Sequence, residues 1–209
     1  YIFKFIMIIK YFDLKKNLKK DTNFFLLYGL NIGLIEETIN SVFKPILSKN
    51  IFNYEENEIF ANIEEFKENI FNKSFFENDK LIIINRVTDK ILAVIEDIID
   101  KNVTETTIIL KSSNLEKKSK LRNFFEKDKK VIITPFYEDT YQSLMIVAQN
   151  FFKEKKIKIS PQNINLIIER SKGNRISLKN ELKKIESFSL KKPSVELSDI
   201  LKLTNLAEN

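Results

Sequence analysis

The sequence predicts an α/β domain built on a parallel sheet, followed by a small all-α domain. Short apolar runs, typical of buried strands, alternate with apolar residues at helical spacing as far as Pro135. After Pro135 only the helical spacing continues. The chain has 209 residues, of which 43% are apolar and 31% charged, and this suffices to bury a core in one large domain or two modest ones.

Strands and helices are expected in alternation in the first domain. Apolar runs predict strands at residues 7–12, 24–28, 51–54, 81–85, 106–110 and 131–134. Helical spacing predicts a short polar helix or turn at residues 14–20 and longer helices at 34–44, 59–72, 91–99 and 121–125. Pro45 is expected to end or kink the helix at 34–44. Such alternation is typical of βαβ units, whose parallel strands are covered by helices on both faces.

Four helices are expected in the second domain. Residues 139–140 can cap the first helix, and Ser160, which precedes a proline, marks the start of the second. Gly173 ends the second helix, a Lys-rich helix follows, and Ser198 is expected to cap the last. The predicted domains are residues 1–137 and 138–209.

Composition excludes several kinds of chemistry. The sequence contains no Cys and no His, which rules out disulfides, thiolate nucleophiles, Cys/His zinc sites and every His-based triad. The lack of Cys fits a reducing compartment, and a cytoplasmic protein is expected. The net charge is +6, and residues 139–209 carry +5 of it. This excess is either the solvated surface of a Lys-rich protein or a surface that contacts DNA phosphates.

The first twelve residues, YIFKFIMIIKYF, are apolar but too short to span a bilayer, and Lys4 and Lys10 interrupt them. No small-residue cleavage site follows, so neither a signal peptide nor a membrane partner is expected. The sequence begins with Tyr1, and Met7 is expected to be the natural start.

The stretch FFLLYGLNIGLIEE has the layout of a phosphate-binding loop: a strand, a turn containing Gly29 and Gly33, and a helix. A P-loop follows the pattern G-x-x-x-x-G-K-[ST], in which backbone amides and the Lys hold phosphates and the hydroxyl holds Mg²⁺. Here the glycines are one residue too close, and Leu34 and Ile35 stand where the Lys and the hydroxyl residue belong. The stretch is either an ordinary strand-to-helix turn or part of a nucleotide fold that has lost its nucleotide.

An α/β domain followed by a small helical lid resembles the layout of AAA+ proteins, which are P-loop NTPases. A working AAA+ ATPase also needs a buried strand that ends in Asp-Glu, to hold Mg²⁺ and activate water. The candidate strand ends instead in Asn85 and Arg86. The loss of both motifs favours an AAA+-like domain that lacks a functional P-loop and has no catalytic residue, cofactor or metal. Adjacent acid pairs such as Glu64 and Glu65 point in different directions and are interpreted as solvated.

The segment NKSFFENDKLIIINRV carries the candidate partner-binding site. A helix is expected to end in Ser74, Phe75 and Phe76, before a polar turn and a strand. The ordinary interpretation is that both Phe side chains belong to the core. However, Phe66 and Ile70 already face inward from this helix, and adjacent side chains cannot both continue that stripe. At least one is therefore expected to project, as the aromatic anchor of an interface does.

Five stretches together resemble the delta subunit of the bacterial DNA polymerase III clamp loader. They are FFLLYGLN, SFFENDKLIIINRV, LEKKSKLRNFFEKDKKVI, GNRISLKNELKKIESF and VELSDILKLTNLAEN. The resemblance covers the chain from Met7 onward, and it rests on the ordered set across both domains because no single stretch is specific.

This resemblance implies a non-catalytic subunit of a DNA-directed DNA polymerase, that is, of a nucleotidyltransferase complex. Delta-like proteins have an AAA+-like domain and a helical lid, neither of which binds ATP. Their Leu-Phe wedge enters a hydrophobic pocket of the sliding clamp and opens the ring for loading onto primed DNA. Ser74, Phe75 and Phe76 occupy the wedge position here, with Phe in place of the Leu. The family also carries a helical collar that joins the other clamp-loader subunits, and this sequence stops at Asn209, about where the collar is expected to begin.

Two alternatives remain open at the level of sequence. The first is an AAA+ ATPase with a degenerate nucleotide site. The second is a basic DNA-binding module on the lid, carried by Lys172, Arg175, Lys179, Lys183 and Lys184. Lys179 and Lys183 are four residues apart and share a helix face, for which an ordinary solvated surface is the competing interpretation.

Overall fold

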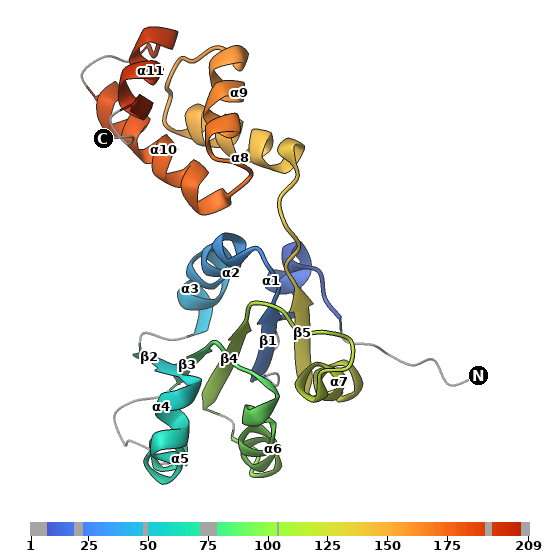
Figure 1. The fold of residues 1–209 in the computed structure, drawn as a ribbon. Coiled ribbons are helices and arrows are strands. Elements are labelled where there is room, and N and C mark those ends of the chain that lie inside the picture. The colour runs from blue at the N-terminus through green and yellow to red at the C-terminus, as the bar shows by residue number, and fades with distance from the viewer. Residues whose placement is uncertain are drawn as a thin grey trace. The chain divides into compact units, whose positions relative to one another are not determined.

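The computed structural model describes residues 8–18, 23–47, 50–71, 79–103, 105–190 and 194–205. The chain divides into two compact units, Tyr1–Tyr137 and Glu138–Asn209. The first unit combines strands and helices, and the second consists of helices (Figure 1).

Five parallel strands form the sheet of the first unit, in the order β2-β3-β4-β1-β5. The strands are β1 (Phe24–Tyr28), β2 (Asn50–Glu55), β3 (Lys80–Asn85), β4 (Thr106–Ser112) and β5 (Val131–Pro135). The five strands predicted from residue 24 onward are thus confirmed. β1 lies between β4 and β5, with Phe24 in register with both Ile108 and Val131.

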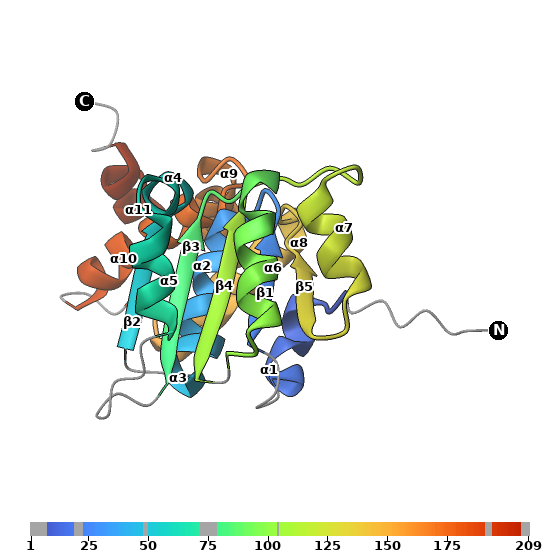
Figure 2. The same ribbon diagram turned by 90° about the horizontal axis from the view of Figure 1, so that it is seen from below.

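Helices cover both faces of the sheet, because the central strands are apolar throughout and send alternate side chains to opposite faces. In β1, Phe24, Leu26 and Tyr28 belong to one apolar cluster, while Phe25 and Leu27 belong to another. The first face carries α4 (Glu56–Ala61), α5 (Ile63–Phe71), α6 (Leu92–Asp100) and α7 (Lys120–Lys127) (Figure 2). The second face carries α1 (Leu14–Asn17), α2 (Ile32–Thr38) and α3 (Lys44–Leu47).

The strand predicted at residues 7–12 is wrong. Ile8 makes one parallel bridge to Ile133, and the Ile9 N–H donates to the Ile133 carbonyl at 3.0 Å. The chain then turns through a 3-10 helix, η1 (Tyr11–Asp13), into α1. This turn buries Leu14 completely in the cluster on the second face of the sheet, which a continued strand would not do.

The helix predicted at residues 34–44 begins earlier and continues through Pro45. α2 runs into a π-helical turn, η2 (Ile39–Phe43), and α3 follows directly. In this turn the Lys44 N–H donates to the Ile39 carbonyl, five residues back. Pro45 has no N–H, and its ring would clash with the carbonyl four residues earlier in a regular α-helix. The wider turn immediately before it accommodates the proline.

The helix predicted at residues 59–72 is divided at Asn62. Asn62 has φ −149° and ψ 74°, which is outside the helical region. Its side-chain amide donates to the Glu65 carboxylate at 2.6 Å, and its carbonyl accepts the Phe66 N–H at 3.2 Å. Asn62 therefore ends α4 and starts α5. Phe66 and Ile70 are buried, as predicted.

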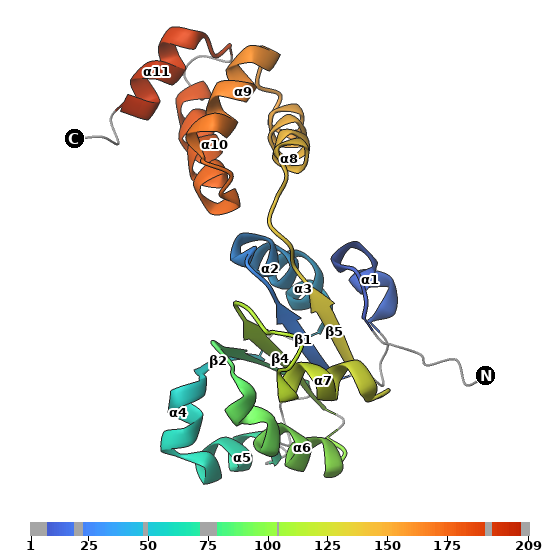
Figure 3. The ribbon, with the colours of Figure 1, turned by 45° about the vertical axis from the view of Figure 1, so that its right-hand side comes forward.

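The second unit is a small helical bundle with its own apolar core (Figure 3). Its helices are α8 (Tyr141–Glu154), α9 (Pro161–Arg170), α10 (Arg175–Ser189) and α11 (Leu197–Asn205). Thr140 and Ser160 cap α8 and α9 through their side chains, as predicted. Ser198 does not cap α11, because the helix already begins at Leu197; Asp199 instead accepts the Glu196 N–H at 3.0 Å. Within the described ranges no helix combines the length and apolar character needed to cross a bilayer.

Candidate functional site

The turn between β1 and α2, where a P-loop would lie, is closed by the chain itself. Gly29 has φ 140°, and a Cβ at this position would lie 2.0 Å from the carbonyl oxygen of Phe136. The Gly29 N–H donates to the Ser112 carbonyl at 3.1 Å, and the Phe136 N–H donates to the Tyr28 carbonyl at 2.7 Å. Glycine is required here because the segment after β5 comes too close for any side chain.

Three backbone amides at the start of α2 already have acceptors. The Asn31 N–H donates to the Phe136 carbonyl at 3.4 Å, and the N–H groups of Leu34 and Ile35 both donate to the Asn31 carbonyl at 3.1 Å. In a P-loop such N–H groups point at the phosphates. These three amides bond within the domain instead, so they are not directed at a ligand.

Asn31 holds this turn in place and was not predicted from the sequence. Asn31 is buried. Its Oδ1 accepts the Leu34 N–H at 3.1 Å, and its Nδ2 donates to the Tyr137 carbonyl at 3.1 Å. It therefore caps α2 and also ties α2 to the segment that follows β5. The sequence did contain a signal for this capping role, because Asn directly before a helical apolar spacing is a preferred N-cap.

The end of β3, where an ATPase needs its acidic pair, is also used structurally. The Asn85 Nδ2 donates to the Tyr54 carbonyl at 3.2 Å, and the Arg86 guanidinium lies 2.9 Å from the Glu55 carboxylate. Both partners belong to the neighbouring edge strand β2. Asn85 thus ties β3 to β2, whereas the Arg86 side chain is largely exposed and its ion pair adds little. Neither residue offers the carboxylate that would bind Mg²⁺.

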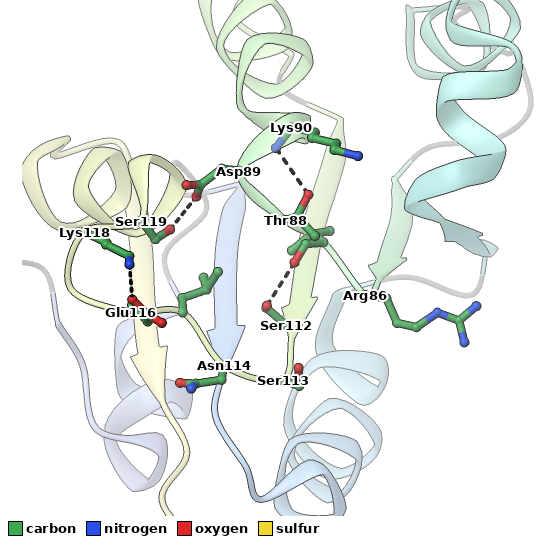
Figure 4. Close-up of a pocket in the computed structure, with 12 residues that line it drawn as sticks. Arg86, Thr88, Asp89, Lys90, Ser112, Ser113, Asn114, Glu116, Lys118 and Ser119 are labelled. Carbon is green, nitrogen blue, oxygen red and sulfur yellow. Dashed lines mark hydrogen bonds and ion pairs between the residues drawn. The ribbon is translucent and has the colours of Figure 1, made fainter.

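A pocket of about 580 Å³ opens where β3 and β4 end, between the loops that follow these strands (Figure 4). In its wall, Asp89 accepts the Ser119 hydroxyl at 2.5 Å and the N–H groups of Lys120 and Leu121 at 3.0 and 3.1 Å. The Ser119 hydrogen bond lowers the pKa of Asp89, against the opposing effect of desolvation. Asp89 therefore acts as an ionised cap for α7 and not as a proton donor. Across the part of the chain that the structure describes, no three acidic side chains are grouped to hold a metal ion.

The predicted clamp-binding residues lie outside the described residues: Ser74, Phe75 and Phe76. The structure does describe both flanks of that segment. On one side α5 ends at Phe71, whose ring lies 4.6 Å from the Lys101 ammonium. On the other side β3 begins at Lys80, whose ammonium donates to the Asn69 carbonyl of α5 at 2.8 Å. Both described flanks of the segment therefore belong to packed elements of the first unit.

The basic residues predicted to contact DNA from the lid differ in accessibility. Lys172 and Lys183 are exposed, and Lys179 is half-buried. Arg175 is buried, and its Nε and Nη2 donate to the two carboxylate oxygens of Asp139 at 2.8 and 2.9 Å. This corrects the prediction for Arg175: its guanidinium is taken up by a buried ion pair and is not presented to phosphates. The sequence could not show this, because Asp139 and Arg175 are 36 residues apart.

Residues 25–135 match the family model described as DNA polymerase III, delta subunit. The match covers more than half of the chain. The chain belongs to this family. A search of curated proteins found no match.

Solved structures provide a second comparison. The chain is similar to the Bacillus subtilis DNA clamp loader delta protein, with 18% identity, a TM-score of 0.59, and coverage of 92% of this chain and 62% of that one. It is also similar to domain III of the Thermotoga maritima replication initiation protein DnaA, with 14% identity, a TM-score of 0.55, and coverage of 92% and 87%. A variant of Thermotoga maritima RuvB matches with 13% identity, a TM-score of 0.60, and coverage of 94% and 65%.

These likenesses concern the fold. They confirm the predicted AAA+-like α/β unit followed by a helical unit, and the delta-family membership predicted from the five stretches is confirmed by the family model. The chain spans about 62% of the length of the Bacillus subtilis delta structure.

Proposed function

We propose that this chain is a non-catalytic clamp-loader subunit of the DNA polymerase III holoenzyme. In this role it binds the sliding clamp through Ser74, Phe75 and Phe76 and helps to open the ring for loading onto primed DNA. The observation that carries the proposal is the match of residues 25–135 to the delta-subunit family. Other clamp-loader subunits and primed DNA are the further partners that this role requires.

The closed turn after β1 supports a role without nucleotide. Gly29 packs against the backbone of Phe136, and the amides of Asn31, Leu34 and Ile35 bond to carbonyl groups of the same unit. A triphosphate would have to compete with these bonds, and no Lys follows Gly33 to compensate. The subunit is therefore proposed to act through binding and not through hydrolysis.

The packing of α5 supports the use of Phe75 and Phe76 as the clamp anchor. Phe66 and Ile70 occupy the inward face of this helix and are 2% and 4% exposed. The core positions of the helix are thus filled before the chain reaches the aromatic pair. Burial of each ring in a pocket of the clamp would contribute on the order of 1.5–3 kcal/mol, which is enough to bias a ring interface.

A binding experiment with the sliding clamp of the same organism tests the proposal. The double variant Phe75→Ala with Phe76→Ala is expected to lose clamp binding, with its stability within about 1 kcal/mol of the wild type. The matched control is Phe52→Ala with Phe60→Ala, which removes two partly exposed rings, 38% and 39% exposed, and is expected to leave clamp binding intact.

Two results would count against the clamp site. Unchanged clamp binding by the first double variant would exclude the aromatic pair as the anchor. A large loss of its stability would place the pair in the core.

The ATPase alternative has a separate test. A ligand that binds only the folded state raises the melting temperature by mass action. MgATP is expected to leave the melting temperature unchanged, because the turn after β1 is closed. A rise that grows with MgATP concentration would favour a degenerate ATPase instead.

A further inference from the structure

The pocket at the ends of β3 and β4 has buried apolar residues in its lining. Val87 and Leu115 line it and are 2% and 6% exposed. Ser113 and Asn114 also line it, and both are exposed. The volume of about 580 Å³ lies within the range of about 300–1,000 Å³ that is common for ligand sites. The pocket can therefore accept a large apolar group between polar edges.

Positive charge is in excess around this pocket. Its lining contains the cations of Arg86, Lys90 and Lys118 and the carboxylates of Asp89 and Glu116. The Asp89 carboxylate already accepts hydrogen bonds from the first residues of α7. Of these two carboxylates, Glu116 alone is left to offset the cations. The pocket therefore favours a partner that carries negative charge.

The cations of the lining are accessible to such a partner. Lys90 is exposed, and among the residues that the structure describes its ammonium is in no ion pair. The Arg86 and Lys118 side chains are 79% and 86% exposed, and their ion pairs with Glu55 and Glu116 are therefore worth little in water. Figure 4 shows Lys118 on the α7 side of the pocket and Arg86 and Lys90 on the β3 side. Cations thus flank the apolar lining on two sides.

We propose that this pocket binds an acidic peptide segment of a partner protein. One large apolar side chain of the peptide packs against Val87 and Leu115, and carboxylates beside it meet Lys90 and Lys118. This is the usual anatomy of a protein interface, in which a buried apolar anchor is surrounded by a polar rim.

The apolar lining favours a peptide over a bare phosphate or a nucleic-acid backbone. A phosphate group would leave Val87 and Leu115 without a partner. The backbone N–H groups of Lys120 and Leu121 at the start of α7 are also occupied, because both donate to Asp89. The pocket contains none of the proposed clamp-binding residues, so the proposal does not depend on clamp binding.

Fluorescence polarisation on the full chain tests the proposal with a fluorescein-labelled peptide that has one Phe between two runs of Asp. This peptide is expected to bind. A second peptide, with Ala in place of the Phe, is expected to bind about ten-fold more weakly or worse, because it loses the apolar burial. No binding of the Phe peptide, or equal affinity of the two peptides, would overturn the proposal.

Charge reversal at the rim provides the protein-side test. Lys90→Glu with Lys118→Glu is expected to weaken binding of the Phe peptide by about ten-fold or more, because it replaces attraction by repulsion. The matched control is Lys129→Glu with Lys130→Glu, which changes the charge equally at two exposed positions before β5 and is expected to retain the affinity. Circular dichroism checks that both variants stay folded. Equal loss in both variants would indicate attraction by overall charge and would overturn the assigned site.

Methyl NMR of the wild-type chain locates the bound peptide without any substitution. The Val87 and Leu115 methyl signals are expected to shift with the Phe peptide and to stay in place with an oligothymidylate of the same charge. If the oligothymidylate shifts these signals and the peptide does not, the surface binds nucleic acid and the proposal is wrong. Peptide binding that leaves both methyl signals in place would also overturn it.

Discussion

Replacement of Gly29 by Ala is expected to destabilise the first unit severely, because the added methyl group meets backbone atoms that cannot rotate away. Its Cβ would lie 2.0 Å from the carbonyl oxygen and 2.8 Å from the carbonyl carbon of Phe136. Displacing residue 136 would break its hydrogen bonds to Tyr28 and Asn31, at a cost of about 1 kcal/mol each. An Ala held near φ 140° adds about 1–3 kcal/mol of strain. The total of about 3–5 kcal/mol is a large share of a typical domain stability of about 5–15 kcal/mol.

Hydrogen–deuterium exchange with mass spectrometry can assign this loss to one unit, because it reports separate peptides. In Gly29→Ala the amides of β1 are expected to exchange roughly 100- to 4,000-fold faster, since the loss is about 3–5 kcal/mol and about 1.4 kcal/mol corresponds to a factor of ten. The amides of α9 are expected to keep their rates.

Gly173→Ala is the matched control for the glycine substitution. Gly173 has φ 74°, but no atom lies within 4 Å of a Cβ built there. Its replacement is therefore expected to cost only the backbone strain, about 1–2 kcal/mol. The steric argument would be refuted if Gly29→Ala accelerated exchange in β1 no more than Gly173→Ala accelerates it in α9.

Three other substitutions probe polar side chains that hold parts of the fold in place. Arg175→Met is expected to cost about 3–5 kcal/mol in thermal unfolding of the helical unit, because the carboxylate of its partner stays buried without compensation; a loss below about 1 kcal/mol would contradict this. Asp89→Asn should destabilise the protein at neutral pH but not in acid. The Ser119 hydroxyl lowers the pKa of Asp89 from 3.8, so the stabilisation is complete above about pH 4 and is lost as the pH falls through the folded-state pKa. Urea midpoints of the two proteins should converge between pH 4 and pH 2, and a constant difference would argue against the ionised cap. Asn31→Ala should cost about 1–3 kcal/mol, because it loses both the cap of α2 and the bond to Tyr137, and an unchanged urea midpoint would show that neither matters.

The first unit keeps the layout of a nucleotide-binding fold while its loops bond to one another. The turn after β1 is closed by the backbone of Phe136, and the end of β3 is tied to β2 by Asn85. Groups that would face phosphates and Mg²⁺ in an ATPase stabilise the scaffold here.

Strands could be predicted well from the sequence because their signal is local. Continuous apolar runs such as LIIIN mark strands that are covered on both faces, and β3 lies where that run predicts it. Helix starts were predicted where a cap was present, as at Thr140 and Ser160. The predictions failed where a packing demand overrode the local pattern. Residues 11–12 were predicted to be part of a strand, but they form a 3-10 turn that leads into α1 and buries Leu14.

The candidate site was only partly accessible to sequence reasoning. The missing Lys after Gly33 and the missing acids after β3 were visible as residue types. The closure of the turn was not, because it depends on Phe136, which reaches Gly29 only when β5 pairs with β1. In the same way, the basic character of Arg175 was visible, but its carboxylate partner was not.

The sequence by itself determined the succession of strands and helices, the break after Pro135, and the absence of phosphate-binding side chains. Each of these follows from residues that are neighbours along the chain, where propensity, apolar spacing and caps act. Only the tertiary structure decided which polar groups satisfy one another. Asn31 meets Tyr137 across 106 residues, and Arg175 meets Asp139 across 36. Such pairs form because the strand order and the helical bundle bring them together, and a buried polar group must then bond to whatever partner the fold provides.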